Sequence, residues 1–197
     1  MKGIGIFLDR DGTINREVEF LKSPSELELI PRSADAIREL NSCGWKVFIL
    51  TNQSGVARGI LSEETLAVVH AALLDMLRKE NASIDAIYYC PHHPEFGESP
   101  YRKDCDCRKP RTALLERAAK EFDLDLERSF VIGDRMIDAQ TANNCRATSV
   151  LVRTGYGKEE IALCRANGVR VDFIADDLYA ALPFVKHALR LEEAGAC

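Results

Sequence analysis

The sequence predicts a three-layer α/β fold in which a parallel sheet carries helices on both faces. Short apolar runs, rich in β-branched and aromatic residues, alternate along the chain with longer stretches of helical periodicity, and this alternation is typical of parallel sheets. A chain of 197 residues with 46% hydrophobic residues is long enough to bury one core but short for two. We therefore expect a single domain over residues 1–197.

Six apolar runs are expected to form buried strands, over 3–8, 46–50, 83–89, 129–133, 148–152 and 171–175. Helices are expected over 33–44, 62–80, 112–122, 138–145 and about 177–192. Ser33 and Ser62 are predicted N-caps, and Gly44 is predicted to end the first helix. The connection after the third strand is too long for a plain turn, and such loops are often functional.

The charge balance argues against two classes of partner. A formal charge of −5 and a pI near 5.5 would not attract nucleic acid or an anionic membrane. No stretch approaches the roughly 18 uninterrupted apolar residues of a membrane helix, and acidic residues follow the N-terminus too early for a signal peptide. We expect a cytoplasmic monomer with reduced thiols that binds a small molecule. Cysteines outside the long loop are scattered, at Cys43, Cys145, Cys164 and Cys197.

Two carboxylates stand directly after the first strand. Asp9 and Asp11 can point the same way from an extended backbone, at the sheet edge where α/β proteins bind ligands. Such a pair repels, and we expect a divalent cation with a preference for oxygen ligands, Mg²⁺, to relieve the repulsion. Taken alone, the pattern also fits two exposed acids in a turn.

Three further strand ends favour the site over the turn. Thr51 follows the second strand, Lys109 opens the helix after the long loop, and Asp134 follows the fourth strand. They add a hydroxyl, a cation and another carboxylate to the same edge. A nucleophile, a proton donor and cations that offset phosphoryl charge are what phosphate-ester hydrolysis needs.

In this order the motifs "DRDGT", "TN", "K" and "GDxxxD" resemble those of haloacid dehalogenase-like (HAD-like) phosphatases, which have a Rossmann-like sheet. The resemblance spans about 4–155. It implies that Asp9 forms an aspartyl phosphate and that Asp11 protonates the leaving group and then activates water. It also implies that Thr51 and Lys109 bind the phosphoryl group and that Lys109 pairs with Asp9.

The same resemblance implies a Mg²⁺ site on Asp9, the backbone carbonyl of Asp11, and Asp134, with Asp138 supporting it from one helical turn further on. Because no large insertion follows the first or second strand, we expect no large cap domain. The segment 17–22 and the long loop would then form the walls of an open site.

The long loop carries a second set of metal ligands. Cys90, His92, Cys105 and Cys107 supply three thiolates and an imidazole, which suit tetrahedral Zn²⁺. Four protein ligands close the coordination sphere, so this zinc loop, 90–107, is expected to be structural. Four unmetallated side chains in a mobile loop remain an alternative, and His93 could replace His92.

"CPHHP...CDCRKP" resembles the zinc-bearing branch that includes the D-glycero-D-manno-heptose 1,7-bisphosphate phosphatases of lipopolysaccharide-core synthesis and the histidinol-phosphate phosphatases. "TNQSGVARG" and the loop length match the heptose enzymes, so the implied substrate is that sugar bisphosphate. The resemblance implies substrate contacts from Glu17, Val18, Glu19, Phe20, Thr51, Asn52, Gln53, Ser54, Arg108, Lys109 and Arg135. Guanidinium groups at Arg108 and Arg135 suit the second phosphate.

Some positions point elsewhere or depart from the pattern. Arg111 begins a segment that differs from the heptose enzymes and is expected to affect the far end of the substrate. His70 and His187 are expected to have packing or solvent roles. Histidinol-phosphate phosphatase is the second enzymatic hypothesis, and a DNA 3'-phosphatase is disfavoured by the charge. From a different class, a non-catalytic, zinc-stabilised binding module is the alternative, although such a protein would be expected to lose Asp9, Asp11, Lys109 or Asp134.

Overall fold

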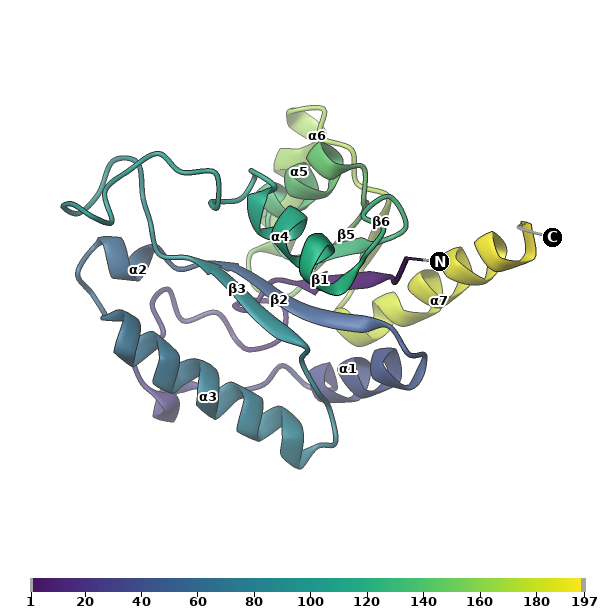
Figure 1. Ribbon diagram of the computed structural model, residues 1–197, viewed down its shortest axis with the longest axis horizontal. Helices are drawn as coiled ribbons and strands as arrows, with labels where there is room; N and C mark the ends of the chain where they lie inside the picture. The colour runs from purple at the N-terminus through teal and green to yellow at the C-terminus, as the bar shows by residue number, and fades with distance from the viewer. Residues whose placement is uncertain (1, 196–197) are drawn as a thin grey trace.

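The computed structural model describes residues 2–195, and its centre is one six-stranded sheet (Figure 1). All neighbouring strands pair in parallel, in the order β3-β2-β1-β4-β5-β6. The strands are β1 (Gly5–Leu8), β2 (Lys46–Asn52), β3 (Ala86–Cys90), β4 (Phe130–Gly133), β5 (Thr148–Val152) and β6 (Phe173–Ala175). Each overlaps one of the six predicted strands, so the predicted fold class is confirmed.

Helices cover both faces of the sheet (Figure 1). One face carries α1 (Ser33–Ser42), α3 (Glu63–Lys79) and α7 (Leu178–Gly195), and the other carries α4 (Ala113–Phe122), α5 (Met136–Cys145) and α6 (Gly157–Ala166). Successive side chains of β1 point to opposite faces of the sheet and pack against both groups of helices. Ile6 and Leu8 pack with the first group, whereas Phe7 stacks on Phe48 in the second. Burial on both sides explains why the strands are apolar throughout.

The helix boundaries follow the expected signals with one exception. Ser62 caps α3 by accepting a hydrogen bond from the backbone N–H of Thr65, and Gly44 follows α1 with a φ of +77°. The predicted cap at Ser33 is wrong, because Ser33 is already the first residue of α1. Arg32 takes the cap position in a left-handed conformation and makes no side-chain cap bond.

Three short or weakly patterned elements were not predicted. They are the 3-10 turn η1 (Pro24–Glu26), the single turn α2 (Ser54–Ala57), and α6. In α6 only Gly157, Ile161 and Cys164 are buried, so its sequence has little apolar periodicity. None of the helices in the described part of the chain is long and apolar enough to cross a bilayer.

The strand order decides where the motifs meet. Because β1 lies between β2 and β4, the carboxyl ends of these three strands are neighbours at one edge of the sheet. Asp9, Thr51 and Asp134 all lie at these ends. The zinc loop follows β3, and the chain returns to the same edge at Lys109, whose backbone is hydrogen-bonded by Asn52 of β2 before α4 begins.

Candidate active site

Asp9 directly follows β1 and lies at the base of the site, 8% exposed. Its Oδ1 accepts hydrogen bonds from the backbone N–H of Arg10 at 2.8 Å and pairs with Lys109 Nζ at 3.0 Å. Burial raises the pKa of Asp9 to about 6, against the attraction of Lys109, which lowers it. The attraction of Lys109 favours the ionised form of Asp9, which is the form a nucleophilic carboxylate needs.

Lys109 is buried and has all three ammonium protons engaged. Nζ donates to the backbone carbonyl of Leu50 at 2.9 Å and pairs with Asp138 at 2.6 Å, in addition to Asp9. Burial lowers its pKa, but the charges of Asp138 and Asp9 outweigh burial, so the net pKa is raised. The geometry thus supports the predicted pairing with Asp9. A direct contact with a phosphoryl group would have to replace one of these three bonds.

Asp134 has the features of a cation ligand. Its side chain is 1% exposed; Oδ2 accepts the backbone N–H of Tyr156 at 2.8 Å, and Oδ1 is buried without a hydrogen-bond partner in the described structure. Burial, then Asp9 and Asp138, raise the pKa of Asp134 to about 8. Gly12 lies so close, with φ +77°, that a Cβ there would come within 2.2 Å of Oδ2. A divalent cation would satisfy both the free oxygen and the excess negative charge.

Asp138 belongs to the same group but has less to offer a metal. Ligand atoms of Asp9, Asp134 and Asp138 lie within 4.8 Å of one another. However, Asp138 Oδ1 pairs with Lys109 at 2.6 Å and Oδ2 accepts the backbone N–H of Arg135 at 3.0 Å. Both oxygens are committed, which suits the predicted supporting role of Asp138 rather than direct coordination.

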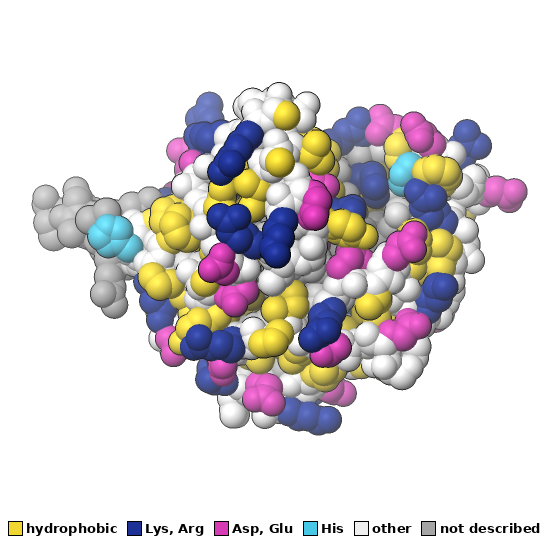
Figure 2. All heavy atoms as spheres, turned by 180° about the vertical axis from the view of Figure 1, so that it is seen from behind, with side chains coloured by type: hydrophobic (Ala, Val, Ile, Leu, Met, Phe, Trp, Pro, Cys, Tyr) yellow, Lys and Arg dark blue, Asp and Glu magenta, His cyan; other side chains and the backbone are white. Residues whose placement is uncertain are grey.

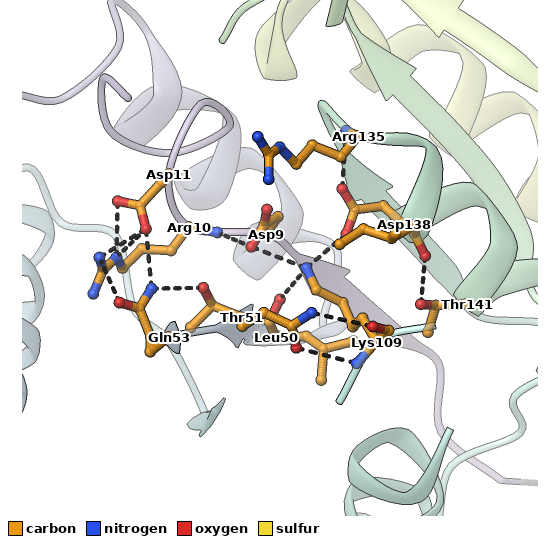
Figure 3. Close-up of polar contacts among 12 residues, drawn as sticks. Asp9, Arg10, Asp11, Leu50, Thr51, Gln53, Lys109, Arg135, Asp138 and Thr141 are labelled. Carbon is orange, nitrogen blue, oxygen red and sulfur yellow. Dashed lines mark hydrogen bonds and ion pairs between the residues drawn. The ribbon is translucent and has the colours of Figure 1, made fainter. Parts of the chain in front are cut away.

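Asp11 points away from this group toward a buried arginine (Figure 3). Arg10 donates to its carboxylate from Nε at 3.1 Å and from Nη2 at 2.7 Å. Asn15 and Gln53 add side-chain N–H donors at 2.9 and 3.0 Å. Burial raises the pKa of Asp11, but the charge and hydrogen bonds of Arg10 outweigh burial, and the net pKa is lowered. Asp11 is held here as a carboxylate.

A cavity of about 330 Å³ opens above Asp9 and Asp11. Predicted contacts that line it are Glu17, Glu19, Phe20, Thr51, Asn52, Gln53, Ser54, Arg108, Lys109 and Arg135. Val18 does not line it and is 43% exposed. Arg58, His93 and Tyr156 line the cavity and were not predicted. His93 Nδ1 accepts the backbone N–H groups of Glu95 and Phe96, so His93 has a local partner of its own.

Asn52 and Gln53, two of the predicted substrate contacts, hold other residues of the site through their side chains. Asn52 clamps the backbone of Lys109, accepting from its N–H at 3.1 Å and donating to its carbonyl at 3.2 Å. Gln53 donates to Thr51 Oγ1 at 2.9 Å and to Asp11, and accepts from Arg10. These side chains therefore orient the catalytic candidates, whatever they also contact in a substrate.

The zinc loop brings its four predicted ligands together. Cys107 Sγ lies 3.1 Å from Cys105 Sγ, 3.3 Å from Cys90 Sγ and 3.2 Å from His92 Nδ1. Thiolates about 2.3 Å from a tetrahedral Zn²⁺ are about 3.8 Å apart, so the donor atoms are grouped closely enough to hold this ion. His92, not His93, belongs to this group.

Side chains outside the ligand set attach the loop to the rest of the domain. Tyr101 in the loop and Tyr89 on β3 donate to the two carboxylate oxygens of Glu63 at the start of α3, at 2.8 and 2.6 Å. Arg111 pairs with Asp104 at 2.7 Å and donates to the carbonyl of Cys105 at 2.8 Å. Arg111 is thus engaged with the zinc loop and does not line the cavity above Asp9 and Asp11, and its influence on the far end of a substrate stays a prediction.

Comparison with known proteins adds an independent result. The HAD-hydrolase-like family matches residues 106–181. The D-glycero-D-manno-heptose-1,7-bisphosphate 7-phosphatase of Chlorobaculum tepidum is 37% identical over 183 residues, 90% of this chain and 91% of the relative. The D-glycero-beta-D-manno-heptose-1,7-bisphosphate 7-phosphatase of Escherichia coli K12 is 40% identical over 151 residues, 76% of this chain and 79% of the relative.

A solved structure agrees with these relatives. The crystal structure of D,D-heptose 1,7-bisphosphate phosphatase from B. bronchiseptica, complexed with magnesium and phosphate, matches with a TM-score of 0.82 at 33% identity. The match covers 95% of this chain and 98% of that chain. With the motifs gathered at one sheet edge, the chain therefore belongs to the D-glycero-D-manno-heptose-1,7-bisphosphate 7-phosphatase family of HAD-like hydrolases.

Proposed function

We propose that the protein is a Mg²⁺-dependent phosphatase that removes the 7-phosphate of D-glycero-D-manno-heptose 1,7-bisphosphate, leaving heptose 1-phosphate and inorganic phosphate. The observation that carries the proposal is the buried Asp9–Lys109 pair at the base of a cavity lined by arginine side chains. The relatives support the choice of substrate.

In the first step Asp9 attacks phosphorus and the bond from phosphorus to the sugar oxygen breaks. Lys109 and the N–H of Arg10 both contact Oδ1, which leaves Oδ2 for the attack. Asp11 gives a proton to the leaving oxygen. A phosphate dianion beside Asp11 opposes the effect of Arg10 on its pKa, so bound substrate favours the protonated form that this step needs.

In the second step water hydrolyses the aspartyl phosphate. Asp11, now a carboxylate held by Arg10, Asn15 and Gln53, accepts the proton of the attacking water, and Asp9 is regenerated. When bound, Mg²⁺ would offset the negative charge on the phosphoryl oxygens, and Asp9, Asp134 and the Asp11 carbonyl would hold it.

Arg108 and Arg135 suit the phosphate that is not cleaved. Both line the cavity, Arg108 donates to the carbonyl of His92, and Arg135 lies over the ring of Tyr156 at 4.3 Å. Two guanidinium groups held in this way can bind a phosphate through paired hydrogen bonds. The contact of Arg108 with His92 also links the proposed zinc site to this end of the substrate.

The physiological form we infer is a single-domain, cytoplasmic monomer without a nucleic-acid or membrane partner. Positive and negative side chains are interspersed on the face in Figure 2, which offers no continuous basic surface for a polyanion. The formal charge of −5 acts in the same direction. Sedimentation of the purified protein would test the monomer.

The direct test of function measures phosphate release from heptose 1,7-bisphosphate and from histidinol phosphate side by side. We expect kcat/KM to favour the bisphosphate by at least about 100-fold, since histidinol phosphate has no second phosphate for the arginines. Equal turnover of the two substrates would overturn the substrate assignment. No turnover of either would favour the non-catalytic binding module.

A further inference from the structure

Arg10 is a buried guanidinium that contacts both the active site and α3. Its side chain is 1% exposed although it stands between the two catalytic aspartates. One edge, Nε and Nη2, binds the carboxylate of Asp11, and Nη2 also donates to Gln53 at 3.2 Å. The remaining nitrogen, Nη1, lies 3.1 Å from Nε2 of His70 on α3. His70 thus contacts Arg10 on the side away from Asp11.

His70 must be the acceptor in this contact. Arginine has donors only, so Nε2 carries the lone pair and the ring is the neutral tautomer with its proton on Nδ1. The ring is 7% exposed and packs edge-on to Tyr89 with ring centres 5.7 Å apart. Burial, and then the charge of Arg10, lower the pKa of His70 to about 4, so the acceptor form persists at neutral pH.

We propose that His70 is a positioning residue for the phosphatase reaction: by accepting a hydrogen bond from Nη1 of Arg10, it fixes the guanidinium that orients Asp11. An acceptor at this place satisfies the buried Nη1–H group. Without it, this donor would be unpaired, and the guanidinium would rotate toward another acceptor. Because Asp11 is bound by the same rigid planar group, any turn of the guanidinium also moves the proton donor.

The proposal rests on the proposed role of Asp11 and extends it to a residue outside the motifs. It differs from a packing role in what it predicts. Packing requires only volume at position 70, whereas positioning requires an acceptor atom at the place of Nε2. Displacing an acid–base group by about 1 Å can cost up to roughly 100-fold in rate, and the cost should fall on kcat because Asp11 acts in the chemical steps.

Two amide variants separate these roles. In His70→Gln the terminal amide can reach the position of Nε2, whereas in His70→Asn it reaches only the position of Nδ1. We expect His70→Gln to keep kcat within about twofold of the parent and His70→Asn to lose about tenfold in kcat, with KM changed by less than about twofold. His70→Leu, which has no acceptor, should behave as His70→Asn and carries the same test if the asparagine is not tolerated.

Val69→Ala is the matched control. Val69 is the adjacent α3 residue, is fully buried in the core, and has no side-chain atom that could hydrogen-bond Arg10. Its truncation should lower the melting temperature and leave kcat unchanged. The proposal is overturned if folded His70→Asn or His70→Leu has the kcat of Val69→Ala, or if His70→Gln is as slow as His70→Asn.

Asp11→Asn separates this inference from the mechanism on which it rests. If Asp11→Asn keeps parental activity, the acid–base role of Asp11 is wrong. If Asp11→Asn is inactive while all His70 variants are normal, only the role of His70 is wrong. In the double variant Asp11→Asn/His70→Asn we expect no further loss beyond Asp11→Asn alone, because His70 acts through Asp11.

Discussion

The carboxylates of Asp9, Asp134 and Asp138 are gathered from the ends of β1 and β4 and from α5, and all three are buried. The ligands Cys90, His92, Cys105 and Cys107 instead come from the end of β3 and the loop that follows it, and three of them are partly exposed. The first group exists only when the whole sheet is assembled, whereas the second can be organised by a metal in a short segment of chain. The first group is therefore suited to chemistry and the second to holding a loop in place.

Electrostatics separates the two groups further. Burial and mutual repulsion raise the pKa of Asp134 and Asp9, so the carboxylate group carries strain that a cation would relieve. Burial also raises the pKa of the Cys90 and Cys107 thiols, so these two thiols can be neutral in the absence of metal. Loss of Mg²⁺ from the carboxylates should thus affect catalysis and its pH dependence. Loss of Zn²⁺ from the cysteine and histidine ligands should affect the geometry of the loop.

The largest effect is expected at the buried carboxylates of Asp9, Asp134 and Asp138. Asp9→Asn should lower phosphate release by at least about 1000-fold, because an amide cannot form the aspartyl phosphate. Zinc content and the circular dichroism spectrum should not change. Asp106→Asn, at a 91% exposed carboxylate within the zinc loop, is the control and should retain full activity. Activity surviving in Asp9→Asn would remove the distinction between the two groups.

Zinc removal should have a smaller effect of a different kind. Cys107→Ser should lower bound zinc, lower the melting temperature, and raise KM about tenfold while kcat stays within about threefold, because Arg108 and Lys109 follow Cys107 directly. Metal analysis and steady-state kinetics check this. Cys145→Ser, at a free cysteine of α5, should change neither the zinc content nor the kinetic constants. Full activity of zinc-free protein at saturating Mg²⁺ would contradict a positioning role for the loop.

The free energy of unfolding should depend on pH through the buried carboxylates of Asp134 and Asp9. The pKa of Asp134 is about 8 and that of Asp9 about 6, both raised from 3.8. Between about pH 4 and pH 8 the Mg²⁺-free folded protein then binds more protons than the unfolded chain, so its free energy of unfolding falls as the pH rises. We expect a melting temperature several degrees lower at pH 8 than at pH 5.

Mg²⁺ binds the ionised carboxylates and should restore the melting temperature at pH 8 more than at pH 5. Asp134→Asn is the control: its melting temperature should fall less with pH and respond little to Mg²⁺. Zinc is kept in all samples so that the loop does not contribute. A pH dependence of equal size in Asp134→Asn would show that the carboxylate group is not its source.

The smallest effect is expected where the loop meets α3. Tyr101→Phe removes one of the two phenol bonds to Glu63, worth about 1 kcal/mol. KM should rise about twofold to threefold and kcat should not change. Tyr88→Phe removes a comparable phenol bond, to Glu121 on α4, outside the loop and outside the substrate cavity, and should leave KM at the parental value. If both variants have equal KM, the Glu63 contact does not position the loop.

Much of the site could be predicted because its residues occupy strand ends. Asp9 and Asp134 each follow an apolar strand and Thr51 lies near the end of another, and parallel pairing brings such ends to one edge whatever the details of packing. The zinc ligands were predictable for a different reason, since their spacing lies within one loop. Elements with weak periodicity, such as α6, were missed because little of their surface is buried.

By itself, the sequence determined the six strands, five of the seven described α-helices, the motif residues and the local set of zinc ligands, since these depend on periodicity and spacing along the chain. Tertiary structure decided the partners of buried charges: Lys109 between Asp9 and Asp138, and Arg10 between Asp11 and His70. A buried charge must find compensating groups wherever the fold supplies them. His70, which looked like a packing residue in the sequence, is sixty positions from Arg10 and only the packing of α3 on the sheet brings them together.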